Sequence, residues 1–239
     1  MNQFLKLRKS VSALFLLCVL LVQTNIRGAE SFELQDGDRV VFLGDALVEQ
    51  EQYAGWIELM MTTAFPERDV TFRNLGWSAD TPSGKSRFGL SLLPAGREPA
   101  GEGWRQLVKQ LKFTQPTVIV FGYGMASALD SGMEGVAAFT QDYQRLVDTA
   151  KQMQPDLRCV LLSPLGRRSD QSRTTQADAS VLTAYRKAVN QVADNNDGVF
   201  VDLSDVAIDD GLRKDPIHLN DAGYREAAIA IGQALGFDE

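Results

Sequence analysis

The sequence has 239 residues, of which 44% are hydrophobic and 23% charged, with 20 Gly, 8 Pro and 2 Cys. These values lie near the average of globular domains and exclude a collagen-like chain, a disordered polymer and a disulfide-stabilised scaffold. The formal net charge is −7, and the basic residues before Glu30 have no acidic neighbours, so the rest of the chain is more acidic still. A body of that charge repels phosphate backbones, and we expect no nucleic-acid partner.

The N-terminus has the pattern of a secretory signal peptide. Residues 1–9 carry three positive charges, and Val11–Val22 is a nearly unbroken apolar run. This run is short of the roughly 20 apolar residues that a membrane-spanning helix needs. We therefore predict a signal peptide over residues 1–29, with cleavage near Gly28 or Ala29, and an exported protein, periplasmic or secreted. Membrane contact is expected only through this segment, if it stays uncleaved.

From residue 38 onward, short apolar runs alternate with longer amphipathic ones. Strands are expected to start near Arg39, Asp69, Thr117, Arg158 and Val199. Helices are expected over Tyr53–Phe65, Trp104–Phe113, Val136–Met153, Ala177–Ala193 and Ala222–Leu235. Five β-runs separated by helices predict a single α/β domain over residues 30–239, with helices on both faces of one parallel sheet. Ligands of such sheets bind beyond the carboxyl ends of the strands.

Small and polar residues follow the expected strands. The motifs are Gly44-Asp45-Ala46-Leu47, Asn74-Leu75-Gly76-Trp77, Gly122-Tyr123-Gly124-Met125-Ala126 and, near the C-terminus, Asp215-Pro216-Ile217-His218. Their order, spacing and strand-end placement together resemble the SGNH (GDSL) hydrolase superfamily over nearly the whole chain after the signal segment. The resemblance implies a flavodoxin-like three-layer α/β/α sandwich with a five-stranded parallel sheet, whose site lies at the strand ends.

The resemblance also implies roles for individual residues. Asp215 and His218 match the family's catalytic Asp-x-x-His pair. Gly76 matches the glycine whose backbone N–H is an oxyanion donor in the family, and the N–H of Ala46 would be a second donor. Two positions depart from the pattern: Ala46 stands where the family has its catalytic Ser, and Ala126 where it has an oxyanion-binding Asn. An alanine methyl cannot attack a carbonyl, so an acyl-enzyme at residue 46 is excluded.

Other residues near these motifs keep two interpretations. Asp45 either takes part in catalysis or holds the turn after the first strand by accepting backbone N–H groups. Ser78, two positions beyond Gly76, is a candidate for a relocated nucleophile. The stretch Pro82–Gly103, which includes Arg87, is long and rich in Gly and Pro. It is either a lid or substrate-binding loop, or a solvated excursion.

Two functional hypotheses follow from the motifs. The first is an exported esterase acting on acyl or acetyl esters of carbohydrates, through water activated by His218 and Asp215 or through a relocated hydroxyl. The second is a catalytically silent fold that binds a glycan or a partner protein. The ligand expected in the first case is a small-molecule or glycan ester. The sequence contains no phosphate-binding loop and no His or Cys residues at the spacing of a metal site. Gly122-Tyr123-Gly124 lacks the third glycine of a dinucleotide-binding fingerprint. We therefore expect no metal and no cofactor.

Overall fold

The computed structural model describes residues 32–87, 101–166, 178–206 and 210–237. The signal peptide expected over residues 1–29 lies outside these ranges. The described residues from Phe32 onward form one compact unit. Among them, no helix combines the length and the apolar character needed to cross a bilayer.

Five parallel strands form one sheet in the order β2-β1-β3-β4-β5. They are β1 (Arg39–Gly44), β2 (Thr71–Asn74), β3 (Val118–Gly122), β4 (Arg158–Leu162) and β5 (Val199–Val201). The expected fold class, an α/β sandwich with a five-stranded parallel sheet, is confirmed. β2 starts two residues later than expected, because the N–H of Asp69 is held by the side chain of Asp36 and the first ladder bond comes from Thr71.

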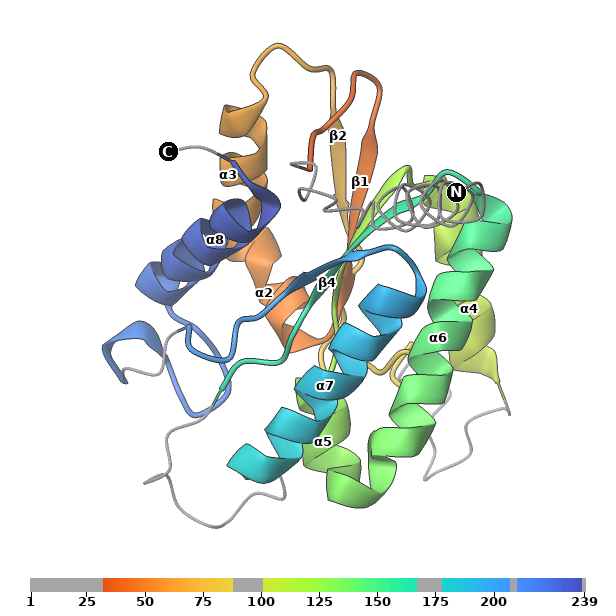
Figure 1. Ribbon diagram of the computed structural model, residues 1–239, viewed down its shortest axis with the longest axis vertical. Coiled ribbons are helices and arrows are strands. Elements are labelled where there is room, and N and C mark those ends of the chain that lie inside the picture. The colour runs from red at the N-terminus through yellow and green to blue at the C-terminus, as the bar shows by residue number, and fades with distance from the viewer. Residues whose placement is uncertain (1–31, 88–100, 167–177, 207–209, 238–239) are drawn as a thin grey trace, which may run out of the picture. The chain divides into compact units, whose positions relative to one another are not determined.

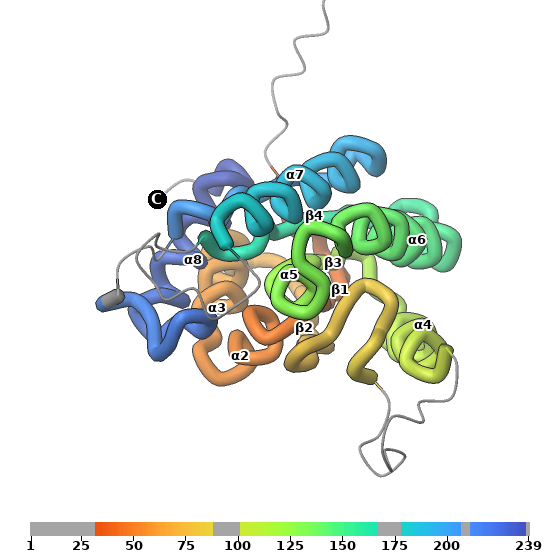
Figure 2. The backbone as a smooth tube through the Cα atoms, turned by 90° about the horizontal axis from the view of Figure 1, so that it is seen from below, coloured from red at the N-terminus to blue at the C-terminus, as the bar shows by residue number. Residues whose placement is uncertain are grey.

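Helices lie on both faces of the sheet. They are α2 (Ala46–Ala54), α3 (Trp56–Ala64), α4 (Glu102–Thr114), α5 (Met125–Ser131), α6 (Val136–Met153), α7 (Ala179–Asn195) and α8 (Asp221–Leu235), with the short 3₁₀ helices η2 (Gly132–Gly135) and η3 (Asp210–Leu212). Figure 1 shows α2, α3 and α8 on one side of the strands and α4, α6 and α7 on the other. Figure 2 shows α3 and α8 side by side from a second direction. The central strands are therefore covered on both faces, and every residue of β3 is buried.

The single helix expected over Tyr53–Phe65 is wrong, because the chain forms two helices there. α2 already begins after Asp45, whose carboxylate caps the helix by accepting the N–H of Leu47. Gly55 ends α2 in the left-handed region, with φ +70°. The carboxylate of Glu51 then accepts the N–H of Ile57 over 2.6 Å, which satisfies a donor at the start of α3. Gly55 therefore ends the helix, although the helical spacing of apolar residues continues past it.

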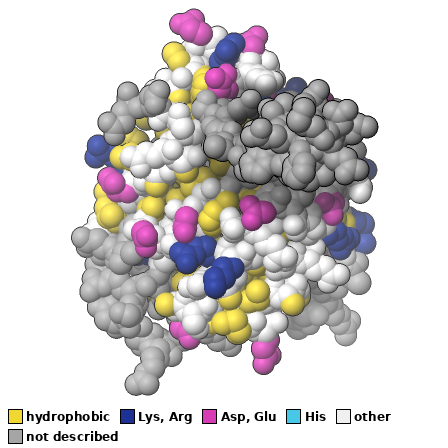
Figure 3. All heavy atoms as spheres, viewed as in Figure 1, with side chains coloured by type: hydrophobic (Ala, Val, Ile, Leu, Met, Phe, Trp, Pro, Cys, Tyr) yellow, Lys and Arg dark blue, Asp and Glu magenta, His cyan; other side chains and the backbone are white. Residues whose placement is uncertain are grey.

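The surface carries charges of both signs. On the face shown in Figure 3, the acidic and basic side chains of the described residues are scattered among apolar and neutral ones. Among the described residues, six large apolar side chains are exposed: Tyr53, Leu59, Trp77, Phe113, Met133 and Ile229. The acidic side chains of the described residues therefore form no single patch on this face.

Candidate functional site

A cavity of about 560 Å³ opens at the carboxyl ends of β1 and β3. The residues predicted from the sequence that line it are Asp45, Ala46, Ser78, Ala126 and His218. Gly76 and Asp215 are not among the described residues of its wall. Much of the remaining wall is apolar and comes from Met125, Leu129 and Ile217. The strand-end motifs of the sequence thus meet at one opening, as the topology of a parallel sheet requires.

His218 and Asp215 form a hydrogen-bonded pair beside this cavity. Nδ1 of His218 lies 2.8 Å from Oδ2 of Asp215. The other carboxylate oxygen accepts the backbone N–H groups of Ile217 and His218, over 2.8 and 2.9 Å. Partial burial raises the pKa of Asp215, but these hydrogen bonds outweigh it and hold the pKa below its usual value. An ionised Asp215 fixes the tautomer of His218 and leaves Nε2 as the ring nitrogen that can accept a proton.

Asp45 ties together the ends of β1 and β3. Its side chain is only 2% exposed. Besides capping α2, its carboxylate accepts the N–H groups of Gly124 and Ala126 at the start of α5, over 3.3 and 3.1 Å. Burial raises the pKa of Asp45 to about 6, although the three N–H donors favour the charged form. This is the turn-holding arrangement that the sequence left as one of two interpretations.

Ala46 is the first residue of α2 and lies on the cavity wall. The first N–H groups of a helix have no acceptor within the helix. Among the described residues, no oxygen accepts the N–H of Ala46. Ala126 lines the same wall, but its N–H is bound to Asp45. Ala46 therefore offers a backbone donor at the cavity, and the Ala126 side chain offers none.

Gly76 lies where the chain after β2 passes closest to α2. Its N–H donates to Oδ1 of Asn74 over 2.8 Å, and Nδ2 of Asn74 donates to the carbonyl of Val48. A Cβ on Gly76 would lie 2.2 Å from the backbone nitrogen of Glu49, so only glycine permits this approach. In this structure the N–H predicted as an oxyanion donor is directed at a protein side chain.

Ser78 is exposed on the cavity wall and is hydrogen-bonded to a carboxylate. Its Oγ donates to Oε2 of Glu49, which lies in the first turn of α2. Ser78 stands at the tip of a tight turn that is closed by the N–H of Asp80 and the carbonyl of Trp77, over 3.1 Å. The next residue, Ala79, has φ +57°, a conformation uncommon for a residue other than glycine.

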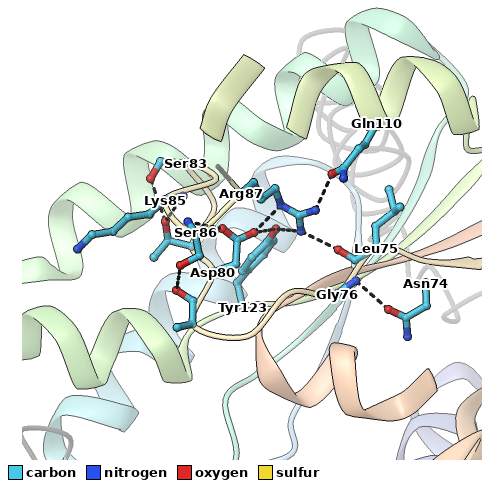
Figure 4. A network of polar contacts seen from close by, with 12 residues as sticks. Asn74, Leu75, Gly76, Asp80, Ser83, Lys85, Ser86, Arg87, Gln110 and Tyr123 are labelled. Carbon is cyan, nitrogen blue, oxygen red and sulfur yellow. Dashed lines mark hydrogen bonds and ion pairs between the residues drawn. The ribbon is translucent and has the colours of Figure 1, made fainter. Parts of the chain in front are cut away.

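A buried ion pair between Arg87 and Asp80 holds the end of this turn in place. Figure 4 shows Arg87 between Asp80, Gln110 and the carbonyl of Leu75. The Arg87–Asp80 distance is 2.7 Å, and Tyr123 donates its hydroxyl to the same carboxylate over 3.1 Å. Arg87 is thus buried and ion-paired inside the protein, whereas Lys85 and Ser86 of the same stretch line the cavity. Residues 88–100 of that loop lie outside the described residues.

Sequence reasoning did not identify Glu49 or Asp80. Glu49 lies three residues after Ala46, which places it one helical turn beyond the strand end, and this spacing is the only sequence signal for it. Asp80 and Arg87 are seven residues apart in a segment without periodicity. In the described ranges, no three His, Cys, Asp or Glu side chains gather as a metal-ligand cluster.

Comparisons with known proteins agree with the fold. A family model described as the GDSL-like lipase/acylhydrolase family matches residues 42–226. No curated protein sequence matches the chain significantly. Among solved structures, a putative GDSL-like lipase from Parabacteroides merdae is 16% identical, with a TM-score of 0.69 over 87% of this chain and 100% of that chain. A mutant of an acetyl-xylooligosaccharide esterase from Geobacillus stearothermophilus is 16% identical, with a TM-score of 0.64 over 86% and 97%. Another acetyl xylan esterase is 18% identical, with a TM-score of 0.55 over 82% and 98%. At these identities the likeness to the solved structures concerns the fold.

Proposed function

The chain belongs to the GDSL-like lipase/acylhydrolase family, and on this premise we propose that its cavity hydrolyses acyl or acetyl esters of carbohydrates. The observation that carries the proposal is the hydrogen bond between His218 and Asp215 at the edge of the cavity. The carbohydrate part of the proposal is supported by the structural neighbours, among which two different proteins are described as acetylxylan or acetyl-xylooligosaccharide esterases.

The spacing of the His–Asp pair supports a catalytic role. Two structures of the Geobacillus esterase are described as catalytic mutants, in which an aspartate and a histidine three positions apart are replaced by alanine. The same spacing separates Asp215 from His218. Because Nδ1 of His218 is paired with the carboxylate, Nε2 is the atom that takes a proton from water in the proposed reaction.

The departures from the family pattern limit the rate. Ala46 cannot be acylated, and Ala126 supplies no side-chain donor for the oxyanion. Losing one oxyanion donor reduces transition-state stabilisation by about 3–4 kcal/mol, or roughly a hundred- to a thousandfold in rate. The N–H of Ala46 is the backbone donor that supports the remaining activity. We therefore propose slow hydrolysis in which His218 is the general base.

The test is acetate release from acetylated xylo-oligosaccharides and from an aryl acetate. Wild-type protein is expected to release acetate above background, and His218→Ala and Asp215→Asn to lower the rate by about a hundredfold or more. The matched control is Asp156→Asn, which removes an exposed carboxylate just before β4. This residue lies at the amino ends of the strands, away from the cavity. Absence of wild-type turnover on a broad ester panel, or turnover unaffected by His218→Ala, would overturn the proposal.

Binding without catalysis is the second candidate, and one observation favours it. The N–H of Gly76 is donated to the side chain of Asn74, and Ala126 has no side-chain donor, so two positions of the family's oxyanion site offer nothing to an oxyanion. In that case we expect calorimetry to detect binding of unmodified xylo-oligosaccharides, and no acetate to be released from acetylated ones. Ala126→Trp should abolish binding because the larger side chain fills the cavity. The partner would then be a glycan or a protein.

Export is part of the proposal. It is supported by the basic residues before Val11–Val22 and by the length of that apolar run. Expression of the full chain with a C-terminal tag, followed by fractionation and N-terminal sequencing, tests it. A mature N-terminus near residue 29 or 30 in the exported fraction is the expected result, whereas an unprocessed protein in the cytosol contradicts it.

A further inference from the structure

We propose that Ser78 is the nucleophile of this protein and that Glu49 is the base that takes its proton. The inference rests on the proposed ester hydrolysis and assigns the group that the alanine at position 46 cannot provide. It divides the reaction into two steps, of which the second uses the water activated by His218.

The first support is the contact between the two side chains. A serine hydroxyl is a weak nucleophile until an adjacent base accepts its proton. Ser78 Oγ already donates to Oε2 of Glu49. Glu49 lies in the first turn of α2, whose first residue is Ala46, so the pair stands one helical turn from the position of the family's nucleophile. Ser78 also lines the cavity and is exposed to it.

The second support is the backbone of the turn that presents Ser78. The turn over residues 77–80 places Ser78 at its tip and Ala79 in the left-handed region, at φ +57°. A residue other than glycine in this region is strained, and such strain clusters at active sites where a side chain must be presented. Asn or Gly would fit the turn with less strain. The strain at Ala79 therefore points to a requirement on its neighbour, Ser78.

The third support is the rigidity of the turn. Asp80, which closes it, is fully buried and paired with Arg87. As Figure 4 shows, Arg87 also holds the carbonyl of Leu75, just before the turn begins. Both ends of the segment that carries Ser78 are thus anchored to buried groups. A nucleophile held in this way loses little conformational freedom on reaching its transition state.

The remaining groups needed for acyl transfer face the same cavity. His218 and Ala46 both line it, and Ala46 has an N–H without an acceptor among the described residues. In the first step Ser78 Oγ forms a bond to the acyl carbon, its proton passes to Glu49, and the carbonyl oxygen becomes an oxyanion that accepts the N–H of Ala46. The bond to the sugar oxygen then breaks, and that oxygen takes the proton from Glu49.

The second step returns the enzyme to its starting state. Water attacks the acyl carbon while its proton passes to Nε2 of His218. The bond to Ser78 Oγ breaks, and Oγ recovers a proton from His218. The products are a carboxylic acid and a sugar hydroxyl, and no other reactant is consumed.

The experiment combines turnover with covalent trapping in the full chain. Wild-type protein is treated with a fluorophosphonate or quenched during turnover of an aryl acetate, and the modified peptide is identified by mass spectrometry. We expect the label on Ser78, its loss in Ser78→Ala, and at least a hundredfold lower turnover in that variant. Glu49→Gln should slow both labelling and turnover at least tenfold. The matched control is Ser83→Ala, which removes a hydroxyl bound to Thr81 in the same loop and should leave both readouts unchanged.

The outcomes separate this inference from the proposed function. If Ser78→Ala keeps wild-type turnover while His218→Ala loses it, water attacks the ester directly; the inference is then wrong and the proposed function stands. If wild-type protein turns over no ester but the fluorophosphonate labels Ser78 in a Glu49-dependent manner, the proposed function fails and the assignment of the nucleophile stands. Absence of any label on Ser78 overturns the inference in either case.

Discussion

The guanidinium of Arg87 lies 2.7 Å from the carboxylate of Asp80, and the two side chains are only 1% and 0% exposed. The same guanidinium donates to the carbonyl of Leu75 and to Gln110 on α4. The pair therefore links the loop that forms one wall of the cavity to the end of β2 and to helix α4. Breaking a buried pair by removing one partner leaves an uncompensated charge.

The first prediction concerns this ion pair. Arg87→Ala should lower the free energy of unfolding by about 3–5 kcal/mol, because it leaves Asp80 buried without its partner. Urea denaturation followed by circular dichroism measures the change. Lys85→Ala is the control: Lys85 lies in the same loop and pairs with Asp130 of α5, but both side chains are about half exposed. Its loss should change stability by less than about 1 kcal/mol, and equal losses in the two variants would refute the argument.

The second prediction is a gain of function at the site. Ala46→Ser should place a hydroxyl on the cavity wall that His218 also lines, and should raise the rate of aryl-acetate hydrolysis. Adding Ala126→Asn should supply the missing side-chain donor to the oxyanion. The double variant should therefore exceed the single one by a factor on the order of ten to a thousand.

The control for this gain is His218→Ala in the double variant, which should abolish it. If the doubly substituted protein folds and remains inert on a broad ester panel, the cavity has lost the geometry of a hydrolase. The binding candidate would then replace the proposed function.

The third prediction concerns stability and pH. Glu51 is 2% exposed, and burial raises its pKa to about 7, while one of its oxygens has no hydrogen-bond partner among the described residues. The unfolded chain loses this proton near the ordinary value of 4.5, whereas the folded chain keeps it until about pH 7. Because the unfolded state binds fewer protons in this window, stability falls as the pH rises from about 4.5 to 7.

Urea unfolding at pH 5 and pH 8 tests this linkage. The decline in unfolding free energy between these two values should be larger in the wild type than in Glu51→Gln, by about 1–3 kcal/mol. Glu67→Gln removes an exposed carboxylate after α3 and should show the wild-type decline. An identical decline in Glu51→Gln and wild type would contradict the raised pKa.

The fourth prediction concerns the contact between Gly76 and α2. Gly76→Ala places a Cβ 2.2 Å from the backbone nitrogen of Glu49, so the loop must move away from the helix. Unfolding free energy should fall by about 1–3 kcal/mol, and ester turnover should fall with it because Ser78 separates from Glu49. Gly232→Ala in α8 is the matched control, since the nearest atom to its Cβ would be in the flexible side chain of Met60, at 3.3 Å. Unchanged turnover in a folded Gly76→Ala variant would weaken the link between this contact and catalysis.

The fold was predictable because its signals are local. A strand such as Val118–Gly122 is apolar at nearly every position, since both faces of a parallel sheet are covered. Helix α6 was predicted with the bounds that the structure shows, because apolar spacing and Pro155 mark it clearly. The break at Gly55 was missed, because the apolar spacing runs on across it and the capping contact of Glu51 with Ile57 spans two helices.

The sequence by itself determined where the strands lie along the chain, which residues follow them and the absence of a hydroxyl at position 46. Those features follow from residue type and from period, which are properties of short segments. Only the tertiary structure decided what the remaining polar groups bind: Ser78 meets Glu49, Arg87 is buried against Asp80, and the N–H of Gly76 turns to Asn74. These contacts depend on the path of the loop after β2, which passes close to the start of α2. The loop has no periodic pattern of apolar residues, and its path follows from the packing of β2 against α2.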